Sequence, residues 1–403
     1  MSRTVLSRRP LVSALVLFGF LASFATTPAF AGDRESAMRM HDRLIGIPPT
    51  EAVLDAMTTL IANANPEGAA QLAMQNPYFY TSTLKTFITP WTNEAQTVFA
   101  PLNDYTATVI GIIRDDLPFT QVLTGNFVYI GRGGAVGAGN QIVGSRYSQT
   151  NNLHYEQLED QNVDLSNTTD FRSWPQDQLP GAVLVASETA GIITTRAAGE
   201  AFFSGGTNRR MMRYLAMNYL CSDMEVMSDI TRPISRIRQD VTRSPGGDSA
   251  IFLNSCSGCH SGLDPLSGAF AYFEWDDVAG RVVHTRGDVQ QKNLINGSTF
   301  PFGYLTVDDR WDNYWREGQN ATYGWDGTLP GSGYGVKSLG EEIAMSRGFA
   351  RCQVQKVFEQ VCFREPADEF ERLEVEDIAD DFEDLGYSMK MVFAKVAAYC
   401  MED

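Results

Sequence analysis

Two cysteines and a histidine stand close together in the stretch NSCSGCHSGLDP, which runs from residue 254 to residue 265. Cys256 and Cys259 have the spacing of two thiols that bond to the two vinyl groups on one edge of a haem. His260 follows the second thiol directly, where its imidazole can ligate the iron. The pattern predicts one covalently attached haem c, with His260 as the proximal iron ligand.

Two other kinds of site use similar spacing. A structural zinc site needs two further Cys or His ligands, but His284 is isolated and the sequence has no second C-x-x-C. A thioredoxin-like redox site follows a buried strand in a small α/β unit, whereas the preceding GGDSAIFLN favours a helix or a turn. The haem site is therefore the favoured interpretation.

The second ring nitrogen of His260 needs a hydrogen-bond acceptor that fixes the tautomer and raises the basicity of the ring. We expect a backbone carbonyl near Asp264 and Pro265 to be this acceptor, because the proline stiffens the loop after the motif. Pro265 is counted as a cofactor-binding residue for this reason. Asp264 is also compatible with an ordinary turn residue.

The sixth iron position decides the chemistry, because Met or a second His favours electron transfer and an open position permits small-ligand or peroxide chemistry. Met345 is the main candidate, since it follows the motif and directly precedes a predicted helix. His284 is the other downstream candidate, or else a surface residue. Met211, Met212 and Met217 lie on one upstream helix, where a stripe of Met is typical of a core.

Three arginines on that upstream helix could pair with haem propionates. A solvated helix face explains them equally well. They are Arg209, Arg210 and Arg213.

The elements that position the motif are expected to be mainly helical. Apolar spacing and capping residues such as Thr50 predict several short helices before residue 130. The last 65 residues predict two helices joined by the acidic turn EPADEFERLEVEDIADDFED. We expect a mainly α fold with short strands and long loops, divided into a signal peptide (1–31), an N-terminal helical region (32–130), an irregular connection (131–178), a helical region packing on the haem domain (179–245) and a c-type haem domain with a C-terminal helical hairpin (246–403).

The first 31 residues have the pattern of a secretory signal, with basic residues, an apolar run of about 14 residues and TTPAFA before Gly32. We expect cleavage near Ala31 and a periplasmic protein without a membrane span, because a spanning helix needs roughly 20 apolar residues. Cleavage changes the net charge from −17 to −20, with 29 basic residues against 49 acidic ones. This charge argues against nucleic-acid binding and favours a redox partner with a basic docking patch.

Four cysteines lie outside the motif, and an exported chain can oxidise them to disulfides. Cys352 and Cys362 lie on one predicted helix, where ten residues separate them by about 15 Å, so they cannot bond to one another. Each is left with Cys221 or Cys400 as a partner. A C-terminal helical hairpin favours Cys352 with Cys400, and free buried thiols are the alternative.

The segments CSGCHSGLDPLSGAFAYFEWDD and EIAMSRGFARCQVQKVFEQVCFREP resemble the haem-binding and C-terminal segments of the bacterial planctomycete-type cytochromes c. RLIGIPPTEAVLDAM and YTATVIGIIRDDLPFTQVL are similar to the helical region that opens many of those proteins. Ser267 before Gly268, and Cys362 and Phe363 before Arg364, depart from the family pattern. The resemblance implies a haem and an exported location, and it implies no particular reaction.

These observations predict an exported mono-haem c-type cytochrome that transfers single electrons. A haem oxidoreductase with an exchangeable sixth iron ligand is a second hypothesis, since about 370 mature residues exceed what one electron-carrying haem requires. A third hypothesis is a structural haem subunit of a larger envelope complex.

Overall fold

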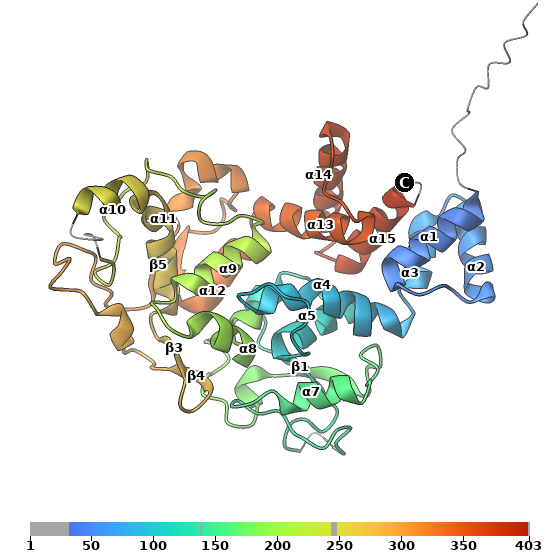
Figure 1. Cartoon of the computed structure of the whole chain (residues 1–403), viewed down its shortest axis with the longest axis horizontal. Coiled ribbons are helices and arrows are strands. Elements are labelled where there is room, and N and C mark those ends of the chain that lie inside the picture. The colour runs from blue at the N-terminus through green and yellow to red at the C-terminus, as the bar shows by residue number, and fades with distance from the viewer. Residues whose placement is uncertain (1–31, 138, 243–247, 402–403) are drawn as a thin grey trace, which may run out of the picture.

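The structure of this chain is a computed structural model that describes residues 32–137, 139–242 and 248–401. The predicted signal peptide and its cleavage near Ala31 lie outside the described residues. Helices predominate and the strands are short (Figure 1), so the prediction of a mainly α fold is confirmed. None of the described helices combines the length and the apolar composition needed to cross a membrane.

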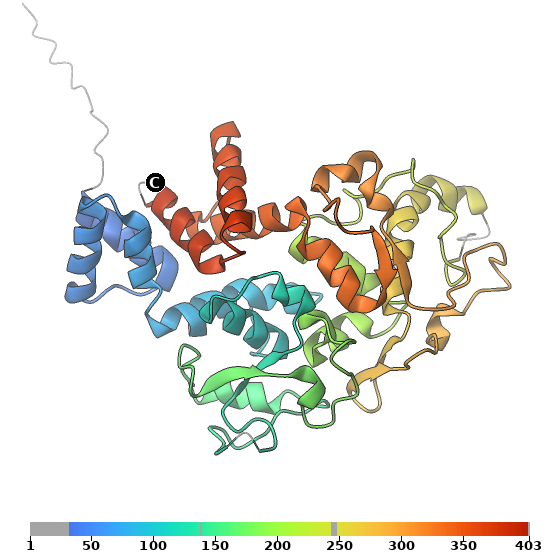
Figure 2. The same cartoon turned by 180° about the vertical axis from the view of Figure 1, so that it is seen from behind.

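The described chain begins with three helices, α1 (Asp33–Ile45), α2 (Glu51–Ala62) and α3 (Pro66–Ala73). The Thr50 side chain caps α2 by accepting a hydrogen bond from the Val53 N–H, as the sequence predicts. The Asn65 side chain caps α3 in the same way. Of these three helices, α1 and α3 pack beside α15 (Met389–Cys400), the last helix of the described chain (Figures 1 and 2).

The central part of the chain is built around a fully buried helix, α5 (Asp104–Arg114). A Cβ atom at Gly111 would lie 2.1 Å from Cγ of Tyr129, so only glycine lets the strand β1 (Val128–Gly131) approach this helix so closely. The short helices α4 (Leu84–Ile88) and α6 (Gln121–Thr124) also pack on α5.

The segment 131–178, expected to be an irregular connection, contains regular elements, including a strand and a helix that pack into the core. Strand β2 (Phe171–Trp174) pairs antiparallel with β1, and α7 (Leu153–Asp160) packs against β1. Tyr155, Leu158 and Phe171 are the side chains that bury these elements in the core. Their spacing is too sparse among Asn, Asp and Ser residues to produce a clear periodic signal.

His154 on α7 connects this helix to β1. Its Nε2 atom accepts the backbone N–H of Gly131 at 3.0 Å, so the proton of the neutral ring lies on Nδ1, which donates to the Ser145 carbonyl at 2.8 Å. Burial lowers the pKa of this imidazole below its ordinary value, and the bond to Ser145 offsets only part of that effect. The folded state therefore favours the neutral ring.

We expect His154 to make the protein sensitive to acid. Below about pH 6.5 the unfolded chain takes up a proton that the folded ring resists, so the free energy of unfolding falls by up to about 1.4 kcal/mol per pH unit until the folded ring also titrates. Urea unfolding from about pH 8 to about pH 5 measures this slope. In His154→Gln, whose side chain does not titrate, the slope should be shallower by that amount, and identical slopes would contradict the assignment.

The second half of the chain begins with α8 (Arg196–Ala198) and α9 (Arg209–Tyr219) and continues with α10 (Ser249–Ser255) and α11 (Ser257–Ser267). Two antiparallel ribbons follow, β3 (Phe273–Asp276) with β4 (Arg281–His284) and β5 (Arg310–Asp312) with β6 (Ser332–Tyr334). The helix α12 (Gly335–Ala344) comes after β6. The helices α10 and α11 lie at the opposite end of the molecule from α1–α3 (Figure 1).

The C-terminal part of the chain contains three helices, α13 (Arg347–Cys362), α14 (Glu369–Asp384) and α15. The prediction of two helices joined by an acidic turn is wrong, because the acidic residues form α14. This helix is capped by Asp368 and buries Val375, Ile378 and Phe382 along one face. Its many carboxylates conceal an apolar spacing of three and four residues that is typical of a helix.

The described residues contain two disulfides, Cys221–Cys352 and Cys362–Cys400, with Cα–Cα distances of 5.3 Å and 5.6 Å. The predicted bond between Cys352 and Cys400 is wrong. In a two-helix hairpin Cys400 would return toward the first half of α13, but the extra helix α14 leaves α15 ending beside the last residue of α13. Cys352 bonds instead to Cys221, just after the end of α9.

Candidate haem site

The C-x-x-C-H motif lies at the junction of two helices. Cys256 is the C-cap of α10 and the N-cap of α11. Its carbonyl accepts a hydrogen bond from the His260 backbone N–H at 3.1 Å. Residues three and four positions apart share one face of a helix. Cys256, Cys259 and His260 therefore present their side chains to the same side of this junction.

The two thiols contact different buried clusters. Cys259 packs against the main hydrophobic core, and its thiol donates to the Met224 carbonyl at 3.2 Å. Cys256 packs against a separate small cluster formed by Ile237, Phe252 and Phe300. Neither thiol is in a disulfide, and burial raises the pKa of the Cys259 thiol. Both cysteines are free to form thioether bonds.

Two glycines allow neighbouring segments to approach α11. A Cβ atom at Gly258 would lie 2.4 Å from Ser228 Oγ and 3.2 Å from Ile230 Cγ2, while one at Gly262 would lie 1.9 Å from Trp315 Nε1. Trp315 is only 1% exposed and belongs to a short 3-10 helix, η9 (Tyr314–Arg316). Residues 228–230 and the indole of Trp315 therefore pack closely along one face of the helix that carries His260.

The imidazole of His260 is oriented by a carboxylate. Its Nδ1 atom lies 2.9 Å from Oδ1 of Asp264, one helical turn further along α11, and its ring lies 5.7 Å from the ring of Phe252. Asp264 accepts hydrogen bonds from other donors as well, so the proton between the two residues belongs to the imidazole Nδ1. This leaves the Nε2 lone pair of His260 for a metal.

Asp264 is fully buried in a network of charged groups. The guanidinium of Arg209 donates to both of its oxygens, with Nε at 2.5 Å and Nη2 at 2.9 Å, and the backbone N–H of Arg238 donates at 2.9 Å. Arg209 also binds Asp240, and Asp240 in turn binds the Arg238 guanidinium at 2.6 Å. The charges of two arginines and two aspartates therefore offset one another in the network that contacts His260 through Asp264.

The network keeps Asp264 ionised. Burial by itself would raise the pKa of this carboxyl, but the charge and hydrogen bonds of Arg209, together with the bond from His260, hold the pKa far below its ordinary value. Burial would also lower the pKa of the Arg209 guanidinium, yet Asp264 and Asp240 raise it above its ordinary value. The acceptor of the His260 proton is therefore a permanent negative charge.

Four expectations about this region are corrected by these contacts. The acceptor for His260 is the Asp264 carboxylate and not a backbone carbonyl, and Asp264 is not a turn residue. Pro265 lies buried inside α11 and not in a loop. Arg209 is not on a solvated face, whereas Arg210 and Arg213 are partly exposed and pair with Glu94 and Asp223.

Two segments that precede the motif in sequence expose apolar side chains. The first of them leaves Val226 and Ile230 67% and 80% exposed, and α10 contributes Ile251 and Leu253. The first segment rests on α11, because the Asp229 N–H donates to the Gly258 carbonyl at 3.1 Å. Exposed apolar patches of this kind are typical of ligand and partner surfaces.

The residues of this site fit a covalently bound haem. Cys256 and Cys259 would hold the porphyrin, His260 would ligate the iron through Nε2, and the exposed apolar side chains would cover part of the macrocycle. Among the described residues, no group of three or more His, Cys, Asp or Glu side chains is arranged to hold a metal ion.

The two candidates for the sixth ligand lie in different surroundings. Met345 follows the last residue of α12 and is 41% exposed. The side chain of His284 on β4 is 5% exposed and lies 4.6 Å from the ring of Phe273, so it is not a surface residue. Burial lowers the pKa of His284. In the described chain neither residue shares a hydrogen bond, ion pair or ring contact with His260, so the contacts leave both candidates open.

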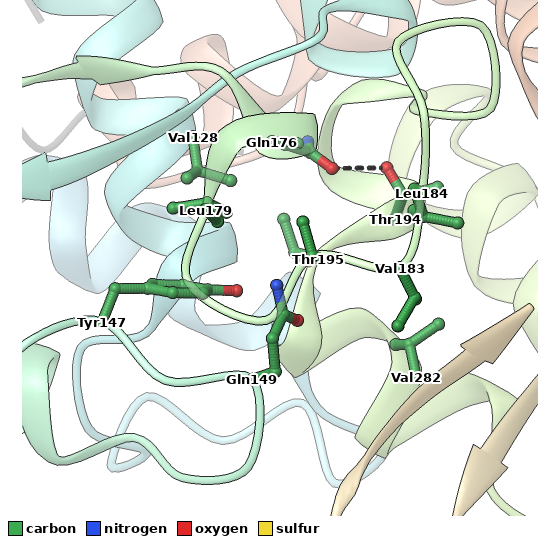
Figure 3. Close-up of a pocket in the computed structure, with 11 residues that line it drawn as sticks. Val128, Tyr147, Gln149, Gln176, Leu179, Val183, Leu184, Thr194, Thr195 and Val282 are labelled. Carbon is green, nitrogen blue, oxygen red and sulfur yellow. Dashed lines mark hydrogen bonds between the residues drawn. The ribbon is translucent and has the colours of Figure 1, made fainter. Parts of the chain in front are cut away.

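A small pocket lies away from the motif, near β1 and β4 (Figure 3). Its volume is about 20 Å³, which accommodates about one water molecule. Gln176 lies in its wall, donates to the Gly191 carbonyl at 2.7 Å and accepts from the Thr194 hydroxyl at 2.8 Å. These polar groups already bond to one another, so we assign the pocket a structural role.

No protein-family model, curated protein or solved structure matches this chain. Sequence reasoning proposed Cys256, Cys259 and His260, which the structure places together at one helix junction. It missed the contact of the Asp264 carboxylate with His260 and the presence of Arg238 and Asp240 beside it. The spacing H-x-x-x-D places two side chains on one helix face and was the available signal for Asp264. Arg238 and Asp240 lie too far from the motif in sequence to be associated with it by spacing.

Proposed function

We propose that this protein is an exported, periplasmic c-type cytochrome with one covalent haem that transfers single electrons. The observation that carries the proposal is the arrangement of two free thiols and an imidazole on one helix face, with the imidazole oriented by Asp264. The resemblance of the motif segments to planctomycete-type cytochromes c also supports it. The acidic composition favours a redox partner with a basic patch.

Each residue of the site has a distinct part in this function. Cys256 and Cys259 anchor the cofactor between the main core and the small cluster, which fixes its position in the chain. His260 offers Nε2 to the iron, and Asp264 holds the ring in the required tautomer and orientation. When bound, the haem supplies a one-electron couple whose potential depends on its ligands and on nearby charge.

The proposal is tested by producing the full chain in a bacterium that attaches haem in its periplasm. We expect the purified protein to contain one haem per chain that resists extraction by acid and acetone and gives a c-type pyridine haemochrome spectrum. Cys256→Ser with Cys259→Ser should lose this covalent haem, whereas Cys362→Ser with Cys400→Ser, which removes two cysteines bonded in a disulfide elsewhere, should keep it. A wild-type protein without covalent haem would overturn the proposal.

A haem oxidoreductase with an exchangeable sixth ligand is the second candidate. The observation that favours it is the Asp264 carboxylate bonded to His260. A proximal imidazole made more basic by this bond would donate more electron density to the iron. The many residues of the chain outside the C-x-x-C-H motif would provide the substrate site of such an enzyme.

Binding of carbon monoxide and cyanide distinguishes the two candidates. For an electron carrier with Met345 as the sixth ligand, we expect the wild-type spectrum to remain unchanged on adding either molecule. Met345→Ala should then bind both, because it opens the sixth position. Spectral changes in the wild-type protein at micromolar ligand concentrations would favour the oxidoreductase instead.

A further inference from the structure

We infer that Asp264 is a positioning residue that sets the reduction potential of the site by accepting the Nδ1 proton of His260, and that Arg209 holds it in place for this task. The inference rests on the proposed function, since it concerns the ligand of a haem iron. Beyond the proposed function, it names Asp264 as the residue that sets how strongly the site donates electrons.

The geometry gives Asp264 a fixed place relative to the imidazole. The two side chains are one turn apart on α11 and their atoms lie 2.9 Å apart. Two hydrogen bonds from Arg209 and one from the Arg238 backbone occupy the remaining positions on the carboxylate. Since all three donors belong to other segments of the chain, Asp264 cannot rotate away from His260 without breaking several charged hydrogen bonds in a buried place.

The electrostatic consequence follows from the sign of the charge. A buried carboxylate bonded to the proximal imidazole gives that ring more anionic character, which stabilises the ferric state over the ferrous state. The potential is therefore lower than it would be with a neutral backbone carbonyl as acceptor. Arg209 reduces this effect through its own positive charge but does not remove the direct bond between Asp264 and His260.

Asp240 provides a matched control within the same network. Its side chain is as fully buried as that of Asp264, and it also bonds to Arg209, but its side-chain partners do not include His260. Asp264→Asn and Asp240→Asn each remove one negative charge from the same group of side chains. Only the first changes the acceptor of the imidazole proton.

The first experiment is a redox titration of the three haem-loaded proteins. We expect Asp264→Asn to shift the reduction equilibrium toward the ferrous state at least tenfold, which is about 59 mV for one electron. We expect Asp240→Asn to shift it by less than half as much in millivolts. Equal shifts in the two variants would mean a general charge effect and would overturn the inference, as would an unchanged potential in Asp264→Asn.

The second experiment needs no haem. Nitrogen NMR of the histidine rings in the full chain with Cys256→Ser and Cys259→Ser, recorded near pH 9 where an ordinary imidazole is neutral, reports which ring nitrogen carries the proton. We expect the His260 proton on Nδ1, and its signal to lose this preference in Asp264→Ala but not in Asp240→Ala. A proton on Nε2 in the parent protein would overturn the inference. Absence of covalent haem in the wild-type protein would refute the proposed function and leave this measurement unaffected.

Discussion

Replacement of Gly262 by alanine is expected to destabilise the protein by about 2–3 kcal/mol, which is among the largest effects available from adding one methyl group. The new Cβ atom would lie 1.9 Å from Nε1 and 2.6 Å from Cδ1 of Trp315. This indole has little room to move aside, because Trp315 is only 1% exposed. Its backbone is also fixed, since the backbone N–H donates to Asn313 Oδ1 and the backbone carbonyl accepts from Trp325 Nε1. The better helix propensity of alanine, worth about 1 kcal/mol, offsets only part of the overlap.

Chemical denaturation of Gly262→Ala measures this effect, and two further variants show its cause. Gly327→Ala is the control, since no atom lies within 4 Å of a Cβ atom placed there, and we expect it to change stability by less than about 0.5 kcal/mol. Combining Gly262→Ala with Trp315→Phe provides space for the methyl group. The double variant should therefore be more stable than the sum of the two single changes, and strict additivity would contradict the proposed overlap.

Loss of the Cys221–Cys352 disulfide is expected to lower the free energy of unfolding by about 3–5 kcal/mol. The bond joins residues that are 131 positions apart, so its removal releases a very large loop in the unfolded chain. Urea unfolding of Cys221→Ser with Cys352→Ser, compared with wild type under non-reducing conditions, measures the loss.

The Cys362–Cys400 bond serves as the comparison, because it joins residues only 38 positions apart. Chain entropy makes its loss about 1 kcal/mol smaller. The larger loop also contains the whole C-x-x-C-H motif, and Cys221 lies three residues before Met224, whose carbonyl bonds to Cys259. Hydrogen exchange near the motif should therefore increase in the Cys221 and Cys352 variant and remain unchanged in the Cys362 and Cys400 variant.

The helical character of the fold could be predicted from local signals. Thr50 and Asn65 cap helices through their own side chains, and such caps are visible over four residues of sequence. The helix α14 was missed because acidic residues dominate its composition, although Val375, Ile378 and Phe382 recur at helical intervals. The strand β2 was missed because its pairing with β1 joins residues 40 to 46 positions apart, and no local pattern encodes that distance.

The candidate site was predictable only where its chemistry is local. Cys256, Cys259 and His260 fall within five residues, so spacing alone identifies them. The carboxylate at Asp264 lies at helical spacing from His260, but it could be interpreted as a partner only once residues 257–267 were known to be helical. Tertiary packing brings Arg209 and Asp240 to Asp264, and no sequence spacing predicts these contacts.

The packing of the first helices on the last one affects the order of folding. Arg43 on α1 donates to the carbonyl of Cys400, 357 residues further along the chain, and α3 packs on α15 as well. During synthesis the helices α1–α3 therefore emerge long before α15, so the surfaces of α1 and α3 that pack on α15 stay uncovered until then. Contacts of such high sequence separation form slowly. We expect these helices to be among the last parts of the molecule to become protected, and to depend on chaperones until the C-terminus is complete.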